Sequence, residues 1–447
     1  MSLPCLFPSF YRFLERLAGT EPRRFFAEKV APRRLITASG RRRPSGSQGL
    51  VSRSNGYALL SALSLSGCAA PQPARKAVPA PDFTVASYFL EQAVAAKAFP
   101  GCAAAVGNHE GILWLEAFGH LDDQGRTPTT AGTLYDLASL TKACGTTLVV
   151  LRLVSTGQLS LEARVVQYLP AFQGGAREQV TVEQLLSHTS GLPAWKPFHL
   201  EVDSYQALFE RVVATPLEAW PGTRAHYSDL GFILLGEVAA RSAGKTLVEL
   251  EKELLWGPLA MRSTTRHIAP EQLDLTAPTE RLVEGQPALR GIVHDENARA
   301  AGGVTGHAGL FSDARDIAQL ASELLRAWRG DSAVFPGQLL RQFAQRQKLG
   351  GGSHALGWDT PSEGSARKSS AGRYFGRHSF GHTGFTGTSL WIDPERDLFV
   401  LLLSNRVHPT RSGRAIHEVR ARLADLVVRA VEPSAQPRKT QPHTAQP

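Results

Sequence analysis

The chain has 447 residues, 43% hydrophobic and 20% charged, a composition typical of globular proteins that argues against a disordered chain. The net charge of +9 suggests an anionic partner, but residues 1–67 alone hold eleven Lys and Arg against three Glu, or +8. The remaining residues hold 38 basic and 37 acidic side chains, or +1, which argues against a nucleic-acid-binding body.

Residues 1–67 are interpreted as a leader that ends in a lipoprotein signal peptide. An arginine precedes an apolar run over residues 57–67, which is too short to span a bilayer but has the length of a signal-peptide h-region. The run ends Leu-Ser-Gly-Cys68, which resembles a bacterial lipobox, so Cys68 is the predicted lipid attachment site. A chance apolar stretch is the alternative. The fifty residues ahead of the run are unusual, and a later translation start would account for them.

The rest of the chain divides into a tether, a folded domain and a tail. Residues 68–84 are rich in Pro and Ala and are expected to form a semi-extended tether. A folded domain is predicted over 85–431 and a disordered tail over 432–447. Two cysteines remain in the domain, Cys102 and Cys144, and either a disulfide or two buried thiols fits their small apolar neighbours. The predicted location is the periplasm, with a lipid anchor in the outer membrane.

The domain opens with a helix and two strands and closes with two strands and a helix. The opening elements are expected at 85–97, 102–108 and 112–119, and the closing ones at 386–393, 397–404 and 412–431. Helical patterns lie between them, at 140–155, 181–186, 204–214, 230–242 and 313–327, and residues 350–377 read as loops. The predicted fold class is therefore α/β or α+β, with an antiparallel sheet built from both chain ends and an inserted helical subdomain.

Ser139 and Lys142 form a Ser-x-x-Lys sequence, which on a helix brings an amine within reach of a hydroxyl. The pattern occurs three times, but only here does the serine begin an amphipathic helix. Free N–H groups and the helix dipole at that end can stabilise an oxyanion. Ser242 lies at a helix C-terminus and Ser365 in a polar stretch. The alternative for Ser139 is a helix cap followed by an exposed lysine. Because a lysine near its usual pKa is a poor base, burial of Lys142 is expected.

Two more elements follow. Tyr227 lies in a Tyr-x-Asp sequence directly before an apolar helix, where a phenol can exchange protons with a lysine and a serine. The sequence Gly-His382-Thr383-Gly384-Phe385 leads into a strand, and its small residues would let a substrate lie against the strand edge.

These three elements, in this order, resemble the active site of the serine β-lactamase and penicillin-binding-protein superfamily, with its Ser-x-x-Lys, Tyr-x-Asn and Lys/His-Thr-Gly motifs. The likeness is to the class C β-lactamase-like branch, which includes low-molecular-weight penicillin-binding proteins, D-aminopeptidases and esterases. It covers roughly residues 85–430 and extends to the sequences at 185–192, 294–297 and 306–311.

The resemblance implies a three-layer sandwich with Ser139 as acylated nucleophile and Lys142 and Tyr227 as coupled base and acid. It also implies an oxyanion hole made by the backbone N–H groups of Ser139 and Phe385. Two departures affect the chemistry. Asp229 replaces the usual Asn, and its carboxylate could pair with Lys142 and keep it protonated. His382 replaces a lysine, which makes the positive charge titratable. Peptide or ester substrates therefore fit better than β-lactams.

The resulting hypothesis is an acyl-enzyme hydrolase of cell-wall-type peptides, either D-Ala-D-Ala carboxypeptidase-like or a D-amidase. A broad esterase on the same scaffold and a catalytically silent peptidoglycan- or penicillin-binding module are the alternatives. The expected partners are a small peptide or ester, peptidoglycan, and a membrane through the lipid anchor, with no nucleic acid. No cofactor or metal is expected. His188 and His307 are interpreted as loop-bracing residues, and Asp295 and Glu296 as structural, since no histidine or carboxylate cluster of metal spacing is evident near them.

Overall fold

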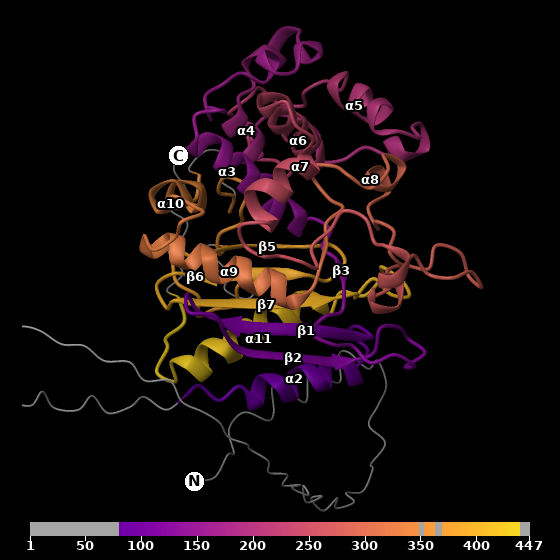
Figure 1. Ribbon diagram of the computed structural model, residues 1–447, viewed down its shortest axis with the longest axis vertical. Coiled ribbons are helices and arrows are strands. Elements are labelled where there is room, and N and C mark those ends of the chain that lie inside the picture. Colours follow the sequence, from indigo (N-terminus) through magenta and orange to yellow (C-terminus); the bar gives the residue numbers. More distant parts are fainter. Residues whose placement is uncertain (1–79, 348–352, 363–368, 439–447) are drawn as a thin grey trace, which may run out of the picture. The chain divides into compact units, whose positions relative to one another are not determined.

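A five-stranded antiparallel sheet is built from both ends of the chain, as predicted (Figure 1). The computed structural model describes residues 80–347, 353–362 and 369–438, so the signal peptide, Cys68 and most of the tether lie outside the described residues. The strands run in the order β2 (Ile112–Gly119), β1 (Gly101–Gly107), β7 (Leu398–Ser404), β6 (Ser389–Asp393) and β5 (Phe380–Thr383). The two ends of the chain meet where β1 pairs with β7.

Strand β1 is buried on both faces because its side chains alternate between two cores. Cys102 and its same-face neighbours pack with helices α2 (Thr84–Ala95) and α11 (Ile416–Val431). Ala103 and Ala105 face the larger core, which includes α9 (Ala314–Arg329). The small side chains of β1 let helices approach both faces, which gives the three layers seen in Figure 1.

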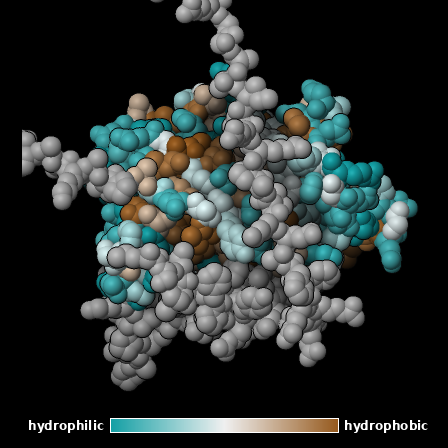
Figure 2. Space-filling view, turned by 90° about the horizontal axis from the view of Figure 1, so that it is seen from below, coloured by the Kyte–Doolittle hydropathy of each residue, from teal (hydrophilic) through white to brown (hydrophobic). Residues whose placement is uncertain are grey.

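Helices α2 and α11 form the layer on the lower side of the sheet in Figure 1. Figure 2 views this side, where apolar side chains gather in brown patches beside hydrophilic ones in teal. Val85 and Tyr88 of α2 are 55% and 51% exposed, whereas Phe89 and Leu90 are buried against the sheet. Among the described helices, none is both long enough and apolar enough to cross a membrane.

The chain between β2 and β5 is mostly helical. Its elements are β3 (Tyr135–Asp136), a π-helical turn (Lys142–Thr146), α3 (Thr147–Ser155), α4 (Val182–Leu186), α5 (Tyr205–Val213), α6 (Asp229–Ala243), α7 (Leu247–Glu251), a second π-helical turn (Lys252–Trp256), α8 (Glu296–Ala300), β4 (Phe311–Ser312), α9 and α10 (Gly337–Ala344). Short 3₁₀ helices cover Val165–Gln167, Pro170–Phe172, Gly175–Gln179, Phe198–Leu200 and Pro270–Leu275. Side chains of Thr181, Ser204, Ser228 and Asp313 cap the helices that follow them.

Some details differ from the sequence expectation. The helix after Ser139 contains the π-helical turn, and α11 begins at Ile416 rather than near residue 412. Residues 432–438, expected to belong to a disordered tail, are described and contact the folded domain. The backbone N–H of Arg438 donates to the Arg373 carbonyl at 2.8 Å. Residues 439–447 lie outside the described part. Cys102 and Cys144 are buried free thiols, which decides between the two alternatives left open by the sequence.

Candidate active site

Ser139 lies in the turn that leads into the helix carrying Lys142. The Lys142 ammonium is fully buried, as predicted, and lies 3.0 Å from the Ser139 hydroxyl oxygen. The preceding residue, Ala138, has a φ of +47°, and its N–H donates to the Asp136 carboxylate at 2.8 Å. This left-handed turn at a non-glycine residue places the serine at the N-terminal end of the helix.

The segment before α6 supplies the next two side chains. The Lys142 Nζ atom lies 5.0 Å from the centre of the Tyr227 ring and 2.7 Å from the Asp229 carboxylate. Interactions with the Lys142 and Ser139 side chains act on the Tyr227 hydroxyl and lower its pKa against the larger effect of burial. Between them, Ser228 caps α6 through Gly231 and donates to the Pro193 carbonyl at 2.6 Å. This double anchoring points Tyr227 and Asp229 toward the lysine.

Lys142 is protonated in the folded protein, whereas a general base would need a neutral amine. Burial by itself lowers the pKa of Lys142, but Asp229 and Tyr227 offset this effect, so the net pKa is raised. Burial also raises the pKa of Tyr227 to about 12, although the Lys142 charge opposes the rise. Burial is confirmed but does not deprotonate Lys142, because Asp229 pairs with the amine and keeps it protonated, as the Asp in this motif suggested. The resting site holds an ammonium ion beside a neutral phenol.

The loop after β5 is fastened to the segment that leads to Ser139. The Thr386 and Thr388 hydroxyls donate to the Asp136 and Leu137 carbonyls at 2.7 and 2.9 Å. Gly384 has no space for a side chain, since a Cβ atom there would lie 2.3 Å from the Leu137 carbonyl oxygen. These contacts hold the Phe385 segment against the strand that precedes Ser139, where its N–H can help to form an oxyanion hole.

His382 contributes no positive charge at neutral pH. Burial lowers its pKa to about 4, even though Asp359 acts in the opposite direction. Its Nδ1 atom donates to the Thr383 carbonyl at 2.8 Å. The sequence predicts a titratable positive charge at this position, but burial moves its titration well below neutral pH. Asp359 also pairs through its backbone with Gly381, at 2.7 and 2.9 Å, and so covers part of the β5 edge.

Two further histidines surround Tyr227. His188 is buried with its ring centre 4.6 Å from that of Tyr227, and its Nδ1 accepts the Ser228 N–H at 3.1 Å. It therefore braces the tyrosine loop, as expected, and also forms a wall of the site. His354 lies 6.1 Å from Tyr227 and bonds to Asp359. Nothing in the sequence pattern indicated His354, because it lies in a Gly/Ser-rich stretch.

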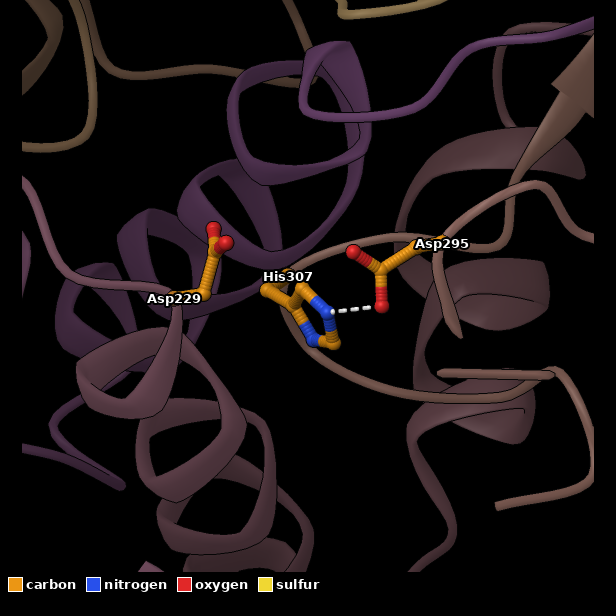
Figure 3. Close-up of side chains that lie close together, drawn as sticks. All are labelled: Asp229, Asp295 and His307. Atoms are coloured by element: carbon orange, nitrogen blue, oxygen red, sulfur yellow. Dashed lines mark hydrogen bonds and ion pairs between the residues drawn. The ribbon is translucent and has the colours of Figure 1, made fainter. Parts of the chain in front are cut away.

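Asp229, Asp295 and His307 could together approach a metal ion, since ligand atoms of all three lie within 4.8 Å of one another (Figure 3). The expectation that Asp295 has no histidine or carboxylate nearby is wrong, because its neighbours come from distant segments. A divalent cation here would meet the Lys142 ammonium, which already pairs with Asp229. Lys142, rather than a metal ion, therefore supplies the positive charge beside Asp229. Glu296 pairs with Arg411 at 2.7 Å and points to a structural role, as predicted.

Comparison with known proteins places this geometry in a family. A family model described as β-lactamase matches residues 88–425. A protein of Escherichia coli K12 named "Putative D-alanyl-D-alanine carboxypeptidase" is 33% identical over 309 residues, which cover 62% of this chain and 70% of that protein. A protein of the same name from Salmonella typhi is 30% identical over 307 residues, which cover 62% and 71%.

Solved structures share the fold at low sequence identity. EstCE1, described as a hydrolase with promiscuous acyltransferase activity, is 22% identical with a TM-score of 0.62, covering 76% of this chain and 97% of that one. A class C β-lactamase from Rhodobacter sphaeroides is 22% identical with a TM-score of 0.61, covering 77% and 98%. The family match and the extent of the E. coli relative together mean that the chain belongs to the β-lactamase family and is a serine hydrolase of the β-lactamase and penicillin-binding-protein type.

Proposed function

We propose that the protein cleaves D-Ala-D-Ala-type peptides through an acyl-enzyme on Ser139, as a carboxypeptidase or D-amidase. The observation that carries the proposal is the convergence of Ser139 and Tyr227, both partly exposed, on the buried Lys142, whose Nζ lies 3.0 Å from the serine oxygen. The relatives named as carboxypeptidases support the substrate class.

Tyr227 is the proposed carrier of the proton. In the reactive form Tyr227 has lost its phenolic proton to solvent. As Ser139 Oγ attacks the substrate carbonyl, its proton passes to the Tyr227 phenolate, and the resulting neutral phenol then protonates the leaving amine. Lys142 remains an ammonium because of Asp229, and its charge stabilises the Tyr227 phenolate of the reactive form. The N–H groups of Ser139 and Phe385 bind the oxyanion. Water then releases the acyl group by the reverse proton path.

The C-terminal carboxylate of such a peptide needs a cation other than the neutral His382. Arg406 is suited to this, since its guanidinium lies 4.4 Å from the Phe385 ring centre and its Nε donates to the Phe385 carbonyl at 2.8 Å. Within the described residues, no carboxylate pairs with Arg406, whereas the neighbouring Arg411 pairs with Glu280 and Glu296. We propose that Arg406 binds the substrate carboxylate.

A broad esterase is the second candidate, favoured by the uncharged His382 and by the likeness of the fold to that of EstCE1. Attachment to the outer membrane through Cys68 and contact with peptidoglycan in the periplasm also remain part of the proposal. They rest on the Leu-Ser-Gly-Cys68 sequence and on the expected substrate.

The test uses purified residues 69–447, which keep the bonded segment around Arg438. Release of D-Ala from a diacetyl-Lys-D-Ala-D-Ala peptide is compared with cleavage of its C-terminal amide and of p-nitrophenyl acetate, in the wild type and in Ser139→Ala. We expect the free acid to be the best peptide substrate and all turnover to be lost in Ser139→Ala. Cleavage of the ester alone would support the esterase. Absence of any turnover, with no labelling by a fluorescent penicillin, would favour a silent module.

A further inference from the structure

Beside Lys142 lies a histidine–carboxylate pair that has no part in the proposed steps; Figure 3 shows its two side chains. His307 is 1% exposed, and its Nε2 lies 2.8 Å from the Asp295 carboxylate. Its Nδ1 lies 2.9 Å from the Thr305 hydroxyl. The Asp295 carboxylate also accepts the Ala298 N–H at 2.8 Å as the N-cap of α8. The imidazole is therefore held at both ring nitrogens.

The backbone of the same histidine touches the predicted catalytic lysine. Lys142 Nζ donates to the His307 carbonyl at 3.0 Å, the same distance as to Ser139. The residues on either side of His307 are also fixed, because the Thr146 hydroxyl donates to the Gly306 carbonyl and Arg266 donates to the Ala308 carbonyl. The hydrogen bonds to the His307 ring and to the neighbouring backbone hold the His307 carbonyl oxygen toward the Lys142 ammonium.

The pair also balances charge near Lys142. Burial raises the pKa of Asp295, but His307 more than offsets this and the net pKa lies far below the usual value. An ionised carboxylate only accepts hydrogen bonds, so His307 Nε2 carries the proton in this bond. Asp229 and Asp295 thus place two carboxylates near one ammonium, and His307 bonds to the second of them.

We propose that His307 and Asp295 are positioning residues for Lys142: the His307 carbonyl orients the ammonium toward Ser139, and the imidazole offsets the charge of Asp295. Without that offset, the negative charge of Asp295 would add to that of Asp229, and the two carboxylates would hold the proton of Lys142 more tightly. The inference rests on the proposed function, since it concerns the proton path from Ser139. Besides the groups already named, His188, His382 and Asp359 act electrostatically on Lys142 or feel its charge.

The test measures kcat/KM for p-nitrophenyl acetate from pH 6 to 10 in the wild type, His307→Gln, Asp295→Asn and the double variant. In His307→Gln, we expect kcat/KM at pH 7.5 to fall about tenfold, since Asp295 is left unpaired. The limb of the pH–rate profile that rises with pH should move to higher pH by about one unit. Asp295→Asn keeps a good N-cap and is expected to shift the limb downward. The double variant should regain most of the activity lost by His307→Gln.

Glu296→Gln is the matched control, because this neighbouring carboxylate pairs with Arg411 and its removal should leave the limb in place. An unmoved limb in Asp295→Asn, or a double variant no better than His307→Gln, would overturn the inference even if His307→Gln folds poorly. Retained turnover in Ser139→Ala would overturn the proposed function and this inference with it. Turnover that depends on Ser139, with no limb shift in Asp295→Asn, would overturn the inference alone.

Discussion

At the scale of single residues, Asp229 controls the charge of the candidate site. Its carboxylate lies 2.7 Å from the Lys142 ammonium and raises the pKa values of both Lys142 and Tyr227. An asparagine, as in the related motif, would leave the lysine more readily deprotonated. In the proposed mechanism, this single side chain therefore moves the proton-carrying role toward Tyr227.

Replacing Asp229 by Asn is expected to shift the alkaline-rising limb of kcat/KM for p-nitrophenyl acetate to lower pH, by about one unit. The sign follows because Asp229 raises both pKa values, so its removal lowers them and the basic form is reached earlier. The pH–rate profile measures this. Asp331→Asn, in an exposed pair with Arg329, serves as the control. A limb at the wild-type position or above it would contradict the role given to Asp229.

At the scale of elements, a buried ion pair joins the lysine-bearing helix to the loop of His307. Glu251, at the end of α7, and Arg266 are both fully buried and bonded at 2.6 and 2.9 Å. The Arg266 guanidinium also donates hydrogen bonds to the carbonyls of Thr305 and Ala308, which lie before and after His307 in the loop. In the π-helical turn, a Cβ atom at Gly145 would lie 2.7 Å from the Glu251 carboxylate, so the glycine lets the helix approach this pair.

Arg266→Met is expected to lower the free energy of unfolding by about 3–5 kcal/mol, because it leaves the Glu251 carboxylate buried without a partner. Urea denaturation at pH 7.5 measures the loss. Arg211→Met breaks the exposed pair with Glu201 and should change stability by less than about 1 kcal/mol. Equal losses in the two variants would show that the buried pair does not join these elements.

At the scale of the whole molecule, the site lies between a sheet that needs both chain ends and the helical region inserted between them. When the chain folds, histidines around this site are buried in their neutral form. Burial lowers the pKa of His188 well below its usual value and that of His382 to about 4. The folded protein therefore resists protonation at positions where the unfolded chain accepts it.

Acidification from pH 7 to pH 4 is therefore expected to destabilise the fold. The folded pKa of His382 is below its unfolded value of 6.5, so its contribution is fully present above pH 6.5 and is lost as pH falls toward 4. The loss from His382 alone is up to about 3 kcal/mol. Urea midpoints across this range measure it, and His382→Asn should flatten the dependence. A wild-type curve as flat as that of the variant would contradict this account.

The sequence by itself was sufficient to predict an antiparallel sheet built from both chain ends and most helices, and its resemblance to a known family predicted that Ser139, Lys142, Tyr227 and His382 come together. The strands and helices follow from local patterns of apolar and polar residues, and the site follows from the order of its three motifs. The family was predicted from the resemblance of the three ordered motifs to a known superfamily, whereas the antiparallel sheet was predicted from strand patterns at both ends of the chain.

Only the tertiary structure decided the charges of Lys142 and His382 and revealed the pairs Asp295–His307 and Glu251–Arg266. A pKa depends on burial and on charges a few ångströms away, which come from segments far apart in the chain. Motif spacing records which side chains can meet within one element. It does not record which distant carboxylate will lie against a buried amine, and that contact sets the protonation state of the site.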